Sequence, residues 1–120
     1  MRLLLSLLFF FLALPAQGQG VQLLVQSSPL AGFRYGEGAA VWEMLQVGDA
    51  LDLVREAENP FDPNAVRVEW HGRKLGYVPR RENAALAWGL DRGTPMRARV
   101  SKLAEHPNPA RRIEFEVYIE

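Results

Sequence analysis

Residues 55–68 combine side chains that could bind a flat ring and a hydroxyl group. Phe61 lies between two prolines, and each proline fixes its own φ and pushes the preceding residue toward extended geometry. Asn59 and Asp62 are residue types that close turns by hydrogen bonding to nearby backbone. The stretch therefore predicts a rigid polar loop that holds an exposed aromatic ring beside fixed hydrogen-bonding groups. A loop with a purely structural role is the alternative.

Other side chains complete a set that could hold a nucleotide. Arginines contact phosphates, and an aromatic ring offers a base a stacking surface worth roughly 1–3 kcal/mol. A carboxylate repels phosphate but accepts a hydrogen bond from a sugar hydroxyl. This mixture suits the end of a strand better than a continuous backbone. The candidates are Arg34, Tyr35, Phe61, Asp62, Arg80 and Arg81.

The sequence predicts neither an enzyme nor a cofactor site. It has no cysteine nucleophile, no phosphate-binding glycine loop and no elbow motif around Ser28 or Ser101. With two histidines and no cysteine, the chain lacks the ligand set that structural zinc sites use. Four acidic residues form a cluster in the sequence, but their spacing matches no calcium-binding loop, so we interpret the cluster as a solvated polar edge. Its members are Asp52, Glu56, Glu58 and Asp62.

The first 18 residues have the pattern of a signal peptide. Arg2 supplies a positive charge, residues 3–14 are apolar apart from one serine, and small residues at 16 and 18 suit a cleavage site. The apolar run is shorter than the ~20 residues that span a bilayer. We expect residues 19–120 to form one exported domain, periplasmic or secreted, with no stable membrane span after cleavage. An uncleaved anchor and a misannotated start are the alternatives.

Composition limits how the mature domain folds and what it binds. The chain has 120 residues and no cysteine, so one core must form without disulfides. Arg2 is one of 14 basic residues against 14 acidic ones, which leaves the mature chain with one net negative charge. Nucleic-acid binding through phosphates usually needs a basic excess, so such binding here would depend on a local patch. We expect a monomer.

Hydrophobic alternation predicts about six strands connected mostly as hairpins, which favours a small antiparallel barrel or a strongly curled sheet. Helical spacing at 81–90 directs Ala84, Ala87, Trp88 and Leu90 toward the core, and a shorter helix or turn is expected at 39–45. Residues 71–73 form a hairpin turn, and Gly93 ends the main helix. The predicted strands are 19–26, 51–55, 65–70, 74–78, 96–104 and 112–119.

These residues together resemble the HIRAN domain family across nearly all of the mature chain, 19–120. The resemblance is carried by Gly32-Phe33-Arg34-Tyr35, by the Asn59-Pro60-Phe61-Asp62-Pro63-Asn64-Ala65-Val66 motif and by Leu75-Gly76-Tyr77-Val78-Pro79-Arg80, followed by the alanine-rich helix. HIRAN domains are small OB-like β-barrels with added helices, so the resemblance implies a mainly β fold. Phe61 stands where a tyrosine is common, and Tyr77 stands where a DNA-remodelling relative has histidine.

The resemblance also implies a ligand, because the HIRAN domain of one DNA-remodelling relative captures the 3′-hydroxyl end of single-stranded DNA. It implies that Arg34 and Tyr35 contact the terminal nucleotide, that Asp62 accepts a hydrogen bond from the terminal hydroxyl, and that Arg80 contacts a phosphate. Asn59 would shape the pocket, Phe61 would stack, and Tyr77 would line the site. The predicted export leaves a second hypothesis, an OB-like interaction module that binds a protein, peptide or glycan in the cell envelope through the same groove.

Overall fold

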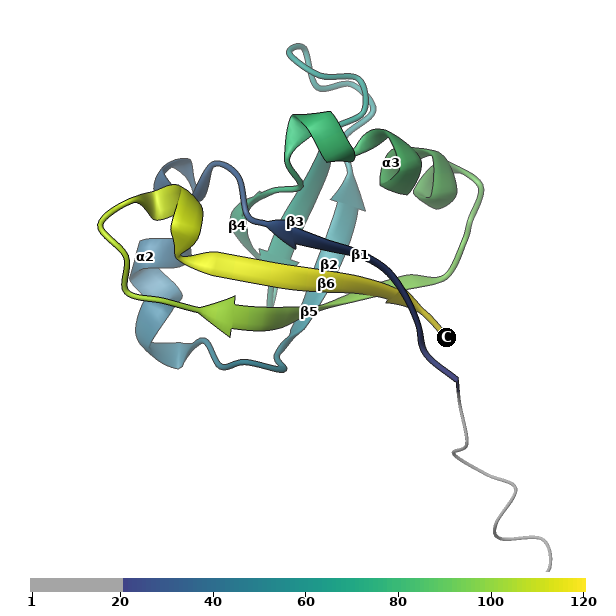
Figure 1. Ribbon diagram of the computed structural model, residues 1–120. Coiled ribbons are helices and arrows are strands. Elements are labelled where there is room, and N and C mark those ends of the chain that lie inside the picture. Colours follow the sequence, from purple (N-terminus) through teal and green to yellow (C-terminus); the bar gives the residue numbers. More distant parts are fainter. Residues whose placement is uncertain (1–20) are drawn as a thin grey trace, which may run out of the picture.

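The computed structural model describes residues 21–120, which form six antiparallel strands and a few short helices (Figure 1). The predicted signal peptide, residues 1–18, lies outside the described residues. The strands are β1 Leu23–Pro29, β2 Ala50–Arg55, β3 Val66–Trp70, β4 Arg73–Tyr77, β5 Met96–Leu103 and β6 Ile113–Ile119. The helices are α2 Gly38–Val41 and α3 Ala84–Asp91, with 3₁₀ turns at Phe33–Tyr35, Trp42–Met44, Arg80–Glu82 and Pro109–Arg111.

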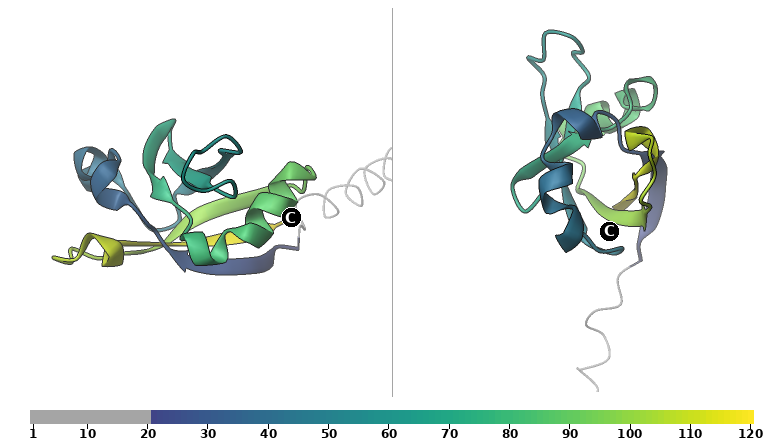
Figure 2. Two further views of the ribbon diagram at one scale, coloured as in Figure 1. Left: turned by 90° about the horizontal axis from the view of Figure 1, so that it is seen from above. Right: turned by 90° about the vertical axis from the view of Figure 1, so that its left-hand side faces the viewer.

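Alternating side chains build one core between the two halves of a curled sheet. The strand order is β1-β6-β5-β2-β3-β4, and every pairing is antiparallel. Successive residues of a strand point to opposite faces, so Val66, Val68 and Trp70 are buried on β3 while Ile113 and Phe115 are buried on β6. In Figure 2 the half made of β1, β6 and β5 faces the half made of β2, β3 and β4.

The two edge strands of the sheet approach each other at a single point. Just beyond β1, Ala31 donates its N–H to the Tyr77 carbonyl at 2.9 Å, and the Tyr77 N–H donates to the Ala31 carbonyl at 2.8 Å. Register shifts in the β1–β6, β3–β4 and β5–β6 pairings increase the local twist that brings the edges together. The sheet is therefore OB-like and strongly curled, as predicted, although its edges do not pair along their length.

The predicted turn between β3 and β4 has the geometry that sheet twist requires. His71 and Gly72 both have positive φ, 48° and 76°, as in the type I′ turn that matches the right-handed twist of a hairpin. Gly93, with φ of 78°, follows α3 and ends it as predicted. Among residues 21–120, no helix has the length and apolar character needed to cross a membrane.

The first strand differs from its prediction. β1 begins at Leu23 and continues through Pro29, whereas the sequence predicted a strand at 19–26 that ended before Ser27. Val21 and Leu23 are 81% and 63% exposed. Only the end of this edge strand lies over the core, where buried Ser28 donates its hydroxyl to Glu82. A side-chain partner from the 3₁₀ turn before α3 satisfies Ser28, which sequence periodicity does not reveal.

The main helix is shorter than predicted and is rotated about its axis. α3 begins at Ala84 because Arg80–Glu82 form a 3₁₀ turn instead of the first helical turn. It buries Leu86 and Ala87, whereas Trp88 is 64% exposed and stacks under the Arg92 guanidinium at 4.1 Å. The predictions that Ala84 and Trp88 face the core are therefore wrong. Two helical turns present only a narrow buried stripe, and buried Asn83 fixes which residues occupy it.

Candidate nucleic-acid interface

The loop between β2 and β3, residues 56–65, projects from one end of the molecule and is fixed by its own side chains (Figure 1). The Asn59 Oδ1 atom accepts hydrogen bonds from the backbone N–H groups of Phe61 at 2.9 Å and Asp62 at 3.1 Å. Asp62 Oδ1 accepts the Asn64 N–H at 2.9 Å. These are the side-chain turns that the asparagine and aspartate positions predict, so the loop is preorganised.

Glu56 anchors the base of this loop. Its carboxylate accepts hydrogen bonds from the Tyr77 hydroxyl at 3.0 and 3.1 Å, from Asn59 Nδ2 at 3.0 Å, and from the Arg67 guanidinium. Burial alone would raise the pKa of Glu56, but these three donors and the charge of Arg67 outweigh it and place that pKa below the ordinary value. The prediction that this carboxylate belongs to a solvated edge is therefore wrong.

Asp62 is held as an anion close to the exposed end of the loop. The backbone N–H of Asn64 lowers the pKa of Asp62 most; burial opposes this effect, while the Asn83 amide and the charges of Arg80 and Arg55 lower the pKa further. Asn83 Nδ2 donates to Asp62 Oδ2 at 2.7 Å. A carboxylate offers about four lone-pair sites and these bonds use two, so Asp62 can still accept a hydrogen bond from a ligand.

Four of the seven predicted binding residues present free surface. Phe61 is 83% exposed and Tyr35 is 78% exposed, so neither ring is buried in the core. Arg34 and Arg80 are exposed as well, and the Arg34 guanidinium lies 5.6 Å from the Tyr35 ring centre. Exposed aromatic rings beside arginines match the stacking and phosphate-binding groups of single-strand binders.

Tyr77 connects the two groups of predicted residues. One group is Asn59, Phe61 and Asp62 on the β2–β3 loop, with Arg80 nearby; the other is Arg34 and Tyr35 in the 3₁₀ turn after β1. The Tyr77 hydroxyl reaches the loop through Glu56, and its backbone pairs with Ala31, just before that turn. Each group adjoins its own hollow, one of about 570 Å³ lined by residues 55–60 and one of about 250 Å³ lined by residues 32–35 and 108–110.

Comparison with known proteins decides the family. The family model of the HIRAN domain matches residues 23–120, which is nearly the whole described chain. The chain belongs to the HIRAN domain family. A search of curated proteins found no match.

Two crystal structures resemble this HIRAN domain. A protein from Lactobacillus plantarum matches with a TM-score of 0.72 and 28% identity, over 82% of this chain and 95% of that one. The HIRAN domain of human HLTF matches with a TM-score of 0.62 and 21% identity, over 84% of this chain and 80% of that one. The likeness to the human domain confirms the fold.

Several residues that shape this HIRAN site were missed by sequence reasoning. Glu56 and Arg67 position Tyr77 and Asn59, and Asn83 holds Asp62. The spacing of Glu56 and Asn59 was the one local signal for a turn contact. Asn83 and the β5–β6 loop, whose residues 108–110 lie beside Arg34 and Tyr35, come from distant parts of the chain. Their placement depends on the curl of the sheet, for which the sequence has no local signal.

The loop network should make stability depend on pH in the acid range. The folded pKa of Glu56 lies below its ordinary value of 4.5. The stability that the Glu56 carboxylate contributes is therefore fully present above pH 4.5 and is lost as pH falls through the folded pKa. At pH 7, Glu56→Gln should lower the free energy of unfolding by about 1–3 kcal/mol, because donors lose a charged acceptor. Urea unfolding from pH 7 to 3 should show this difference from the unmutated protein shrinking below pH 4.5.

A neighbouring residue provides the control for this measurement. Glu58 is exposed in the same loop and makes no side-chain hydrogen bond within residues 21–120. Glu58→Gln should therefore leave stability nearly unchanged at pH 7. Equal losses of stability for the two substitutions would contradict a stabilising role for the hydrogen bonds of Glu56.

Proposed function

We propose that this HIRAN domain binds the ends of single-stranded DNA and prefers a free 3′-hydroxyl. The observation that carries the proposal is Asp62, an anionic carboxylate held by Asn64 and Asn83 on a projecting loop, with acceptor capacity remaining. A hydroxyl group can donate to it, whereas a terminal phosphate would bring like charges together. The exposed Phe61 ring on the same loop supports the proposal because it offers a base a stacking surface.

The cations around the loop support contacts with phosphates rather than with the hydroxyl. Arg80 is exposed and its charge lowers the pKa of Asp62, so a phosphate next to a hydroxyl bound at Asp62 can contact it. Arg34 is exposed and makes no ion pair within residues 21–120. Arg80 beside the loop and Arg34 in the 3₁₀ turn after β1 are two exposed cations that a chain without net positive charge offers to phosphates.

Asp62→Asn should remove the preference between strand ends. The amide keeps an acceptor for the Asn64 N–H but loses the charge that repels a terminal phosphate. In the unmutated protein we expect a 3′-hydroxyl strand to bind about tenfold more tightly than the same strand with a 3′-phosphate, equivalent to ~1.4 kcal/mol. The variant should bind both with similar affinity. Fluorescence-anisotropy titration of the full chain with short labelled strands measures both constants.

Two arginine variants serve as controls for this assay. Arg34→Ala should weaken binding to both strands equally and reduce the salt dependence by about one phosphate contact. Arg97→Ala removes an exposed arginine on β5 that pairs with Glu120, and should change neither affinity nor preference. Equal affinity of the unmutated protein for both ends, or no binding at low salt, would favour the envelope interaction module instead.

We also propose that the protein is exported. The support is the signal-like pattern of residues 1–18, which lies outside the described residues. Mass spectrometry of the cell-envelope fraction should find a chain that begins at or near Gln19. A full-length species confined to the cytosol would contradict export without affecting the proposed binding.

A further inference from the structure

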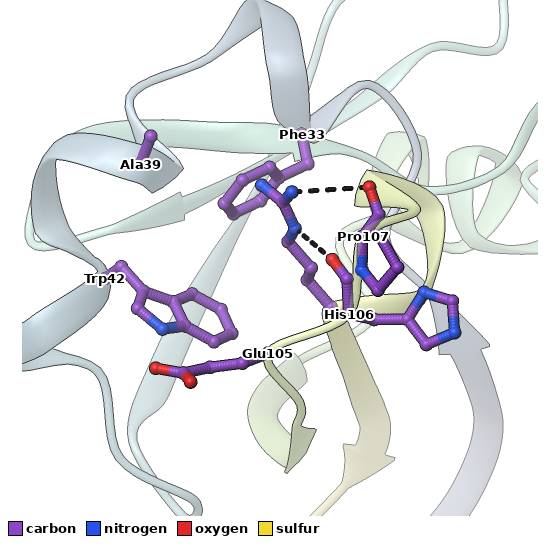
Figure 3. Close-up of a pocket in the computed structure, with 7 residues that line it drawn as sticks. Phe33, Ala39, Trp42, Glu105, His106 and Pro107 are labelled. Atoms are coloured by element: carbon purple, nitrogen blue, oxygen red, sulfur yellow. Dashed lines mark hydrogen bonds between the residues drawn. The ribbon is translucent and has the colours of Figure 1, made fainter.

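A cavity of about 390 Å³ lies apart from the β2–β3 loop and contains none of the seven predicted binding residues (Figure 3). It is open to solvent and is bordered by the 3₁₀ turn after β1, by α2 with the turn that follows it, and by the β5–β6 loop. Its lining residues are Phe33, Ala39, Trp42, Glu105, His106, Pro107 and Arg112.

Two fixed aromatic rings form one wall of this cavity. Phe33 is buried, and Trp42 packs against the core beside it, with ring centres 6.0 Å apart and planes at 90°. Trp42 is only partly buried, so part of its indole faces the cavity (Figure 3). A partly exposed indole held by the core is a stacking surface for a flat ligand.

The cavity also holds two opposite charges that do not neutralise each other. Arg112 donates through Nε to the His106 carbonyl at 2.7 Å and through Nη2 to the Pro107 carbonyl at 3.5 Å, and its guanidinium lies 5.3 Å from the Phe33 ring centre. These bonds fix the guanidinium and leave Nη1 without an acceptor within residues 21–120.

Glu105 is the second charge, and its side chain extends beside Trp42 (Figure 3). It makes no ion pair with Arg112 or with any other base in the described part of the chain. Six other basic side chains do pair with carboxylates there, namely those of Arg55, Arg67, Arg73, Arg97, Arg99 and Lys102. An unpaired acid and an unpaired guanidinium on one cavity suit a flat ligand with a donor edge and an acceptor edge.

We propose that this cavity binds a guanine base. Trp42 stacks on the base, Arg112 donates to the O6 and N7 acceptors, and Glu105 accepts from N1–H and the exocyclic amino group. Arginine is the usual partner of O6 and N7, and unpaired bases are read by hydrogen bonds on both edges with aromatic stacking. Adenine has no N1–H for Glu105 and presents an amino group where Arg112 needs an acceptor.

The cavity lies next to residues that we propose contact the end of a DNA strand, and the link between the two sites rests on that proposed function. Phe33 lines the cavity, while the next two residues, Arg34 and Tyr35, line the neighbouring hollow. The β5–β6 loop borders both, with residues 105–107 on the cavity and 108–110 on the hollow. A bound strand that contacts Arg34 and Tyr35 can therefore place a guanine against Trp42.

Titration of the full chain with GMP, AMP, CMP and UMP, followed by tryptophan fluorescence, tests the cavity without a strand. GMP should bind at least tenfold more tightly than the other three nucleotides. Glu105→Gln should remove that preference, and Trp42→Phe should remove most of the fluorescence change. Glu43→Gln alters an exposed acid beside Trp42 that does not line the cavity, and should behave as the unmutated protein does.

The outcomes separate this proposal from strand-end binding. Asp62→Asn should leave GMP binding unchanged while it alters the choice between strand ends, so either proposal can fail alone. Equal affinity for all four nucleotides, or no saturable change with GMP at millimolar concentration, overturns the guanine site. Saturation of the Trp42 signal by chitotriose but not by GMP overturns it as well and reassigns the cavity to glycans.

Discussion

Gly76→Ala should destabilise the protein by about 3 kcal/mol, because no side chain fits where the edges of the sheet meet. An added Cβ would lie 2.2 Å from the Ala31 carbonyl oxygen and 3.0 Å from Leu30 Cγ. That carbonyl accepts the Tyr77 N–H, so it cannot withdraw without breaking the bridge between the edges. Forcing extra volume into a packed site costs typically 1–3 kcal/mol, and loss of the bridge places this site at the upper end.

A matched glycine separates this effect from a general effect of alanine. At Gly89, in α3, an added Cβ would meet the flexible tip of Met96 at 2.6 Å, and alanine favours the helix by roughly 1 kcal/mol. Urea unfolding should show a large loss for Gly76→Ala and little loss for Gly89→Ala. The Gly76 variant should also bind single strands more weakly, because Tyr77 connects the two groups of site residues. Equal midpoints for the two variants would contradict this account of the bridge.

Local patterns in the sequence were sufficient to predict most strands. The alternation of Val66, Val68 and Trp70, and of Ile113, Phe115 and Val117, is strict because each strand covers the core with one face. The pattern misleads where an element is only half over the core. Leu23 follows the same alternation but lies beyond the core on an edge strand.

Helix α3 shows the corresponding limit for helical spacing. Trp88 falls on an apolar pattern, yet the helix is too short to bury more than Leu86 and Ala87 fully. Its orientation is set by Asn83, whose amide bonds to Asp62 in a loop 21 positions earlier. Contacts of this kind leave no periodic signal in the sequence.

The candidate site also contains residues that could be predicted from the sequence and residues that could not. The residues of the β2–β3 loop could be chosen from the sequence because Asn59 and Asp62 act on backbone groups within three residues. The roles of Tyr77 and Glu56 could not, since their contact depends on how β4 lies beside the base of the loop. Tyr77 uses its hydroxyl to hold Glu56, so we propose that it positions the loop as well as lining the site.

Phe33→Ala should reduce the free energy of unfolding by about 3–5 kcal/mol, the usual cost of deleting a buried phenylalanine. The ring contacts Trp42 and lies so close to Gly38 that a Cβ there would be 2.3 Å from it, so no neighbour can fill the space without moving α2. This loss approaches the lower end of the total stability of domains, which is about 5–15 kcal/mol. Phe33→Leu should cost less and allow binding to be measured on folded protein.

The binding readout distinguishes an anchor from a general core residue. Phe33 precedes Arg34 and Tyr35 in the same 3₁₀ turn, so a smaller side chain should let that turn shift and weaken strand binding. Val117→Ala removes core volume on β6, which pairs with β1 and β5 rather than with this turn, and should lower stability without a specific loss of affinity. If Phe33→Leu and Val117→Ala, compared by anisotropy under conditions where both are folded, bind strands equally well, Phe33 contributes to the core alone. A larger loss for Phe33→Leu is expected, because rigid support of Arg34 and Tyr35 limits the entropy that binding must remove.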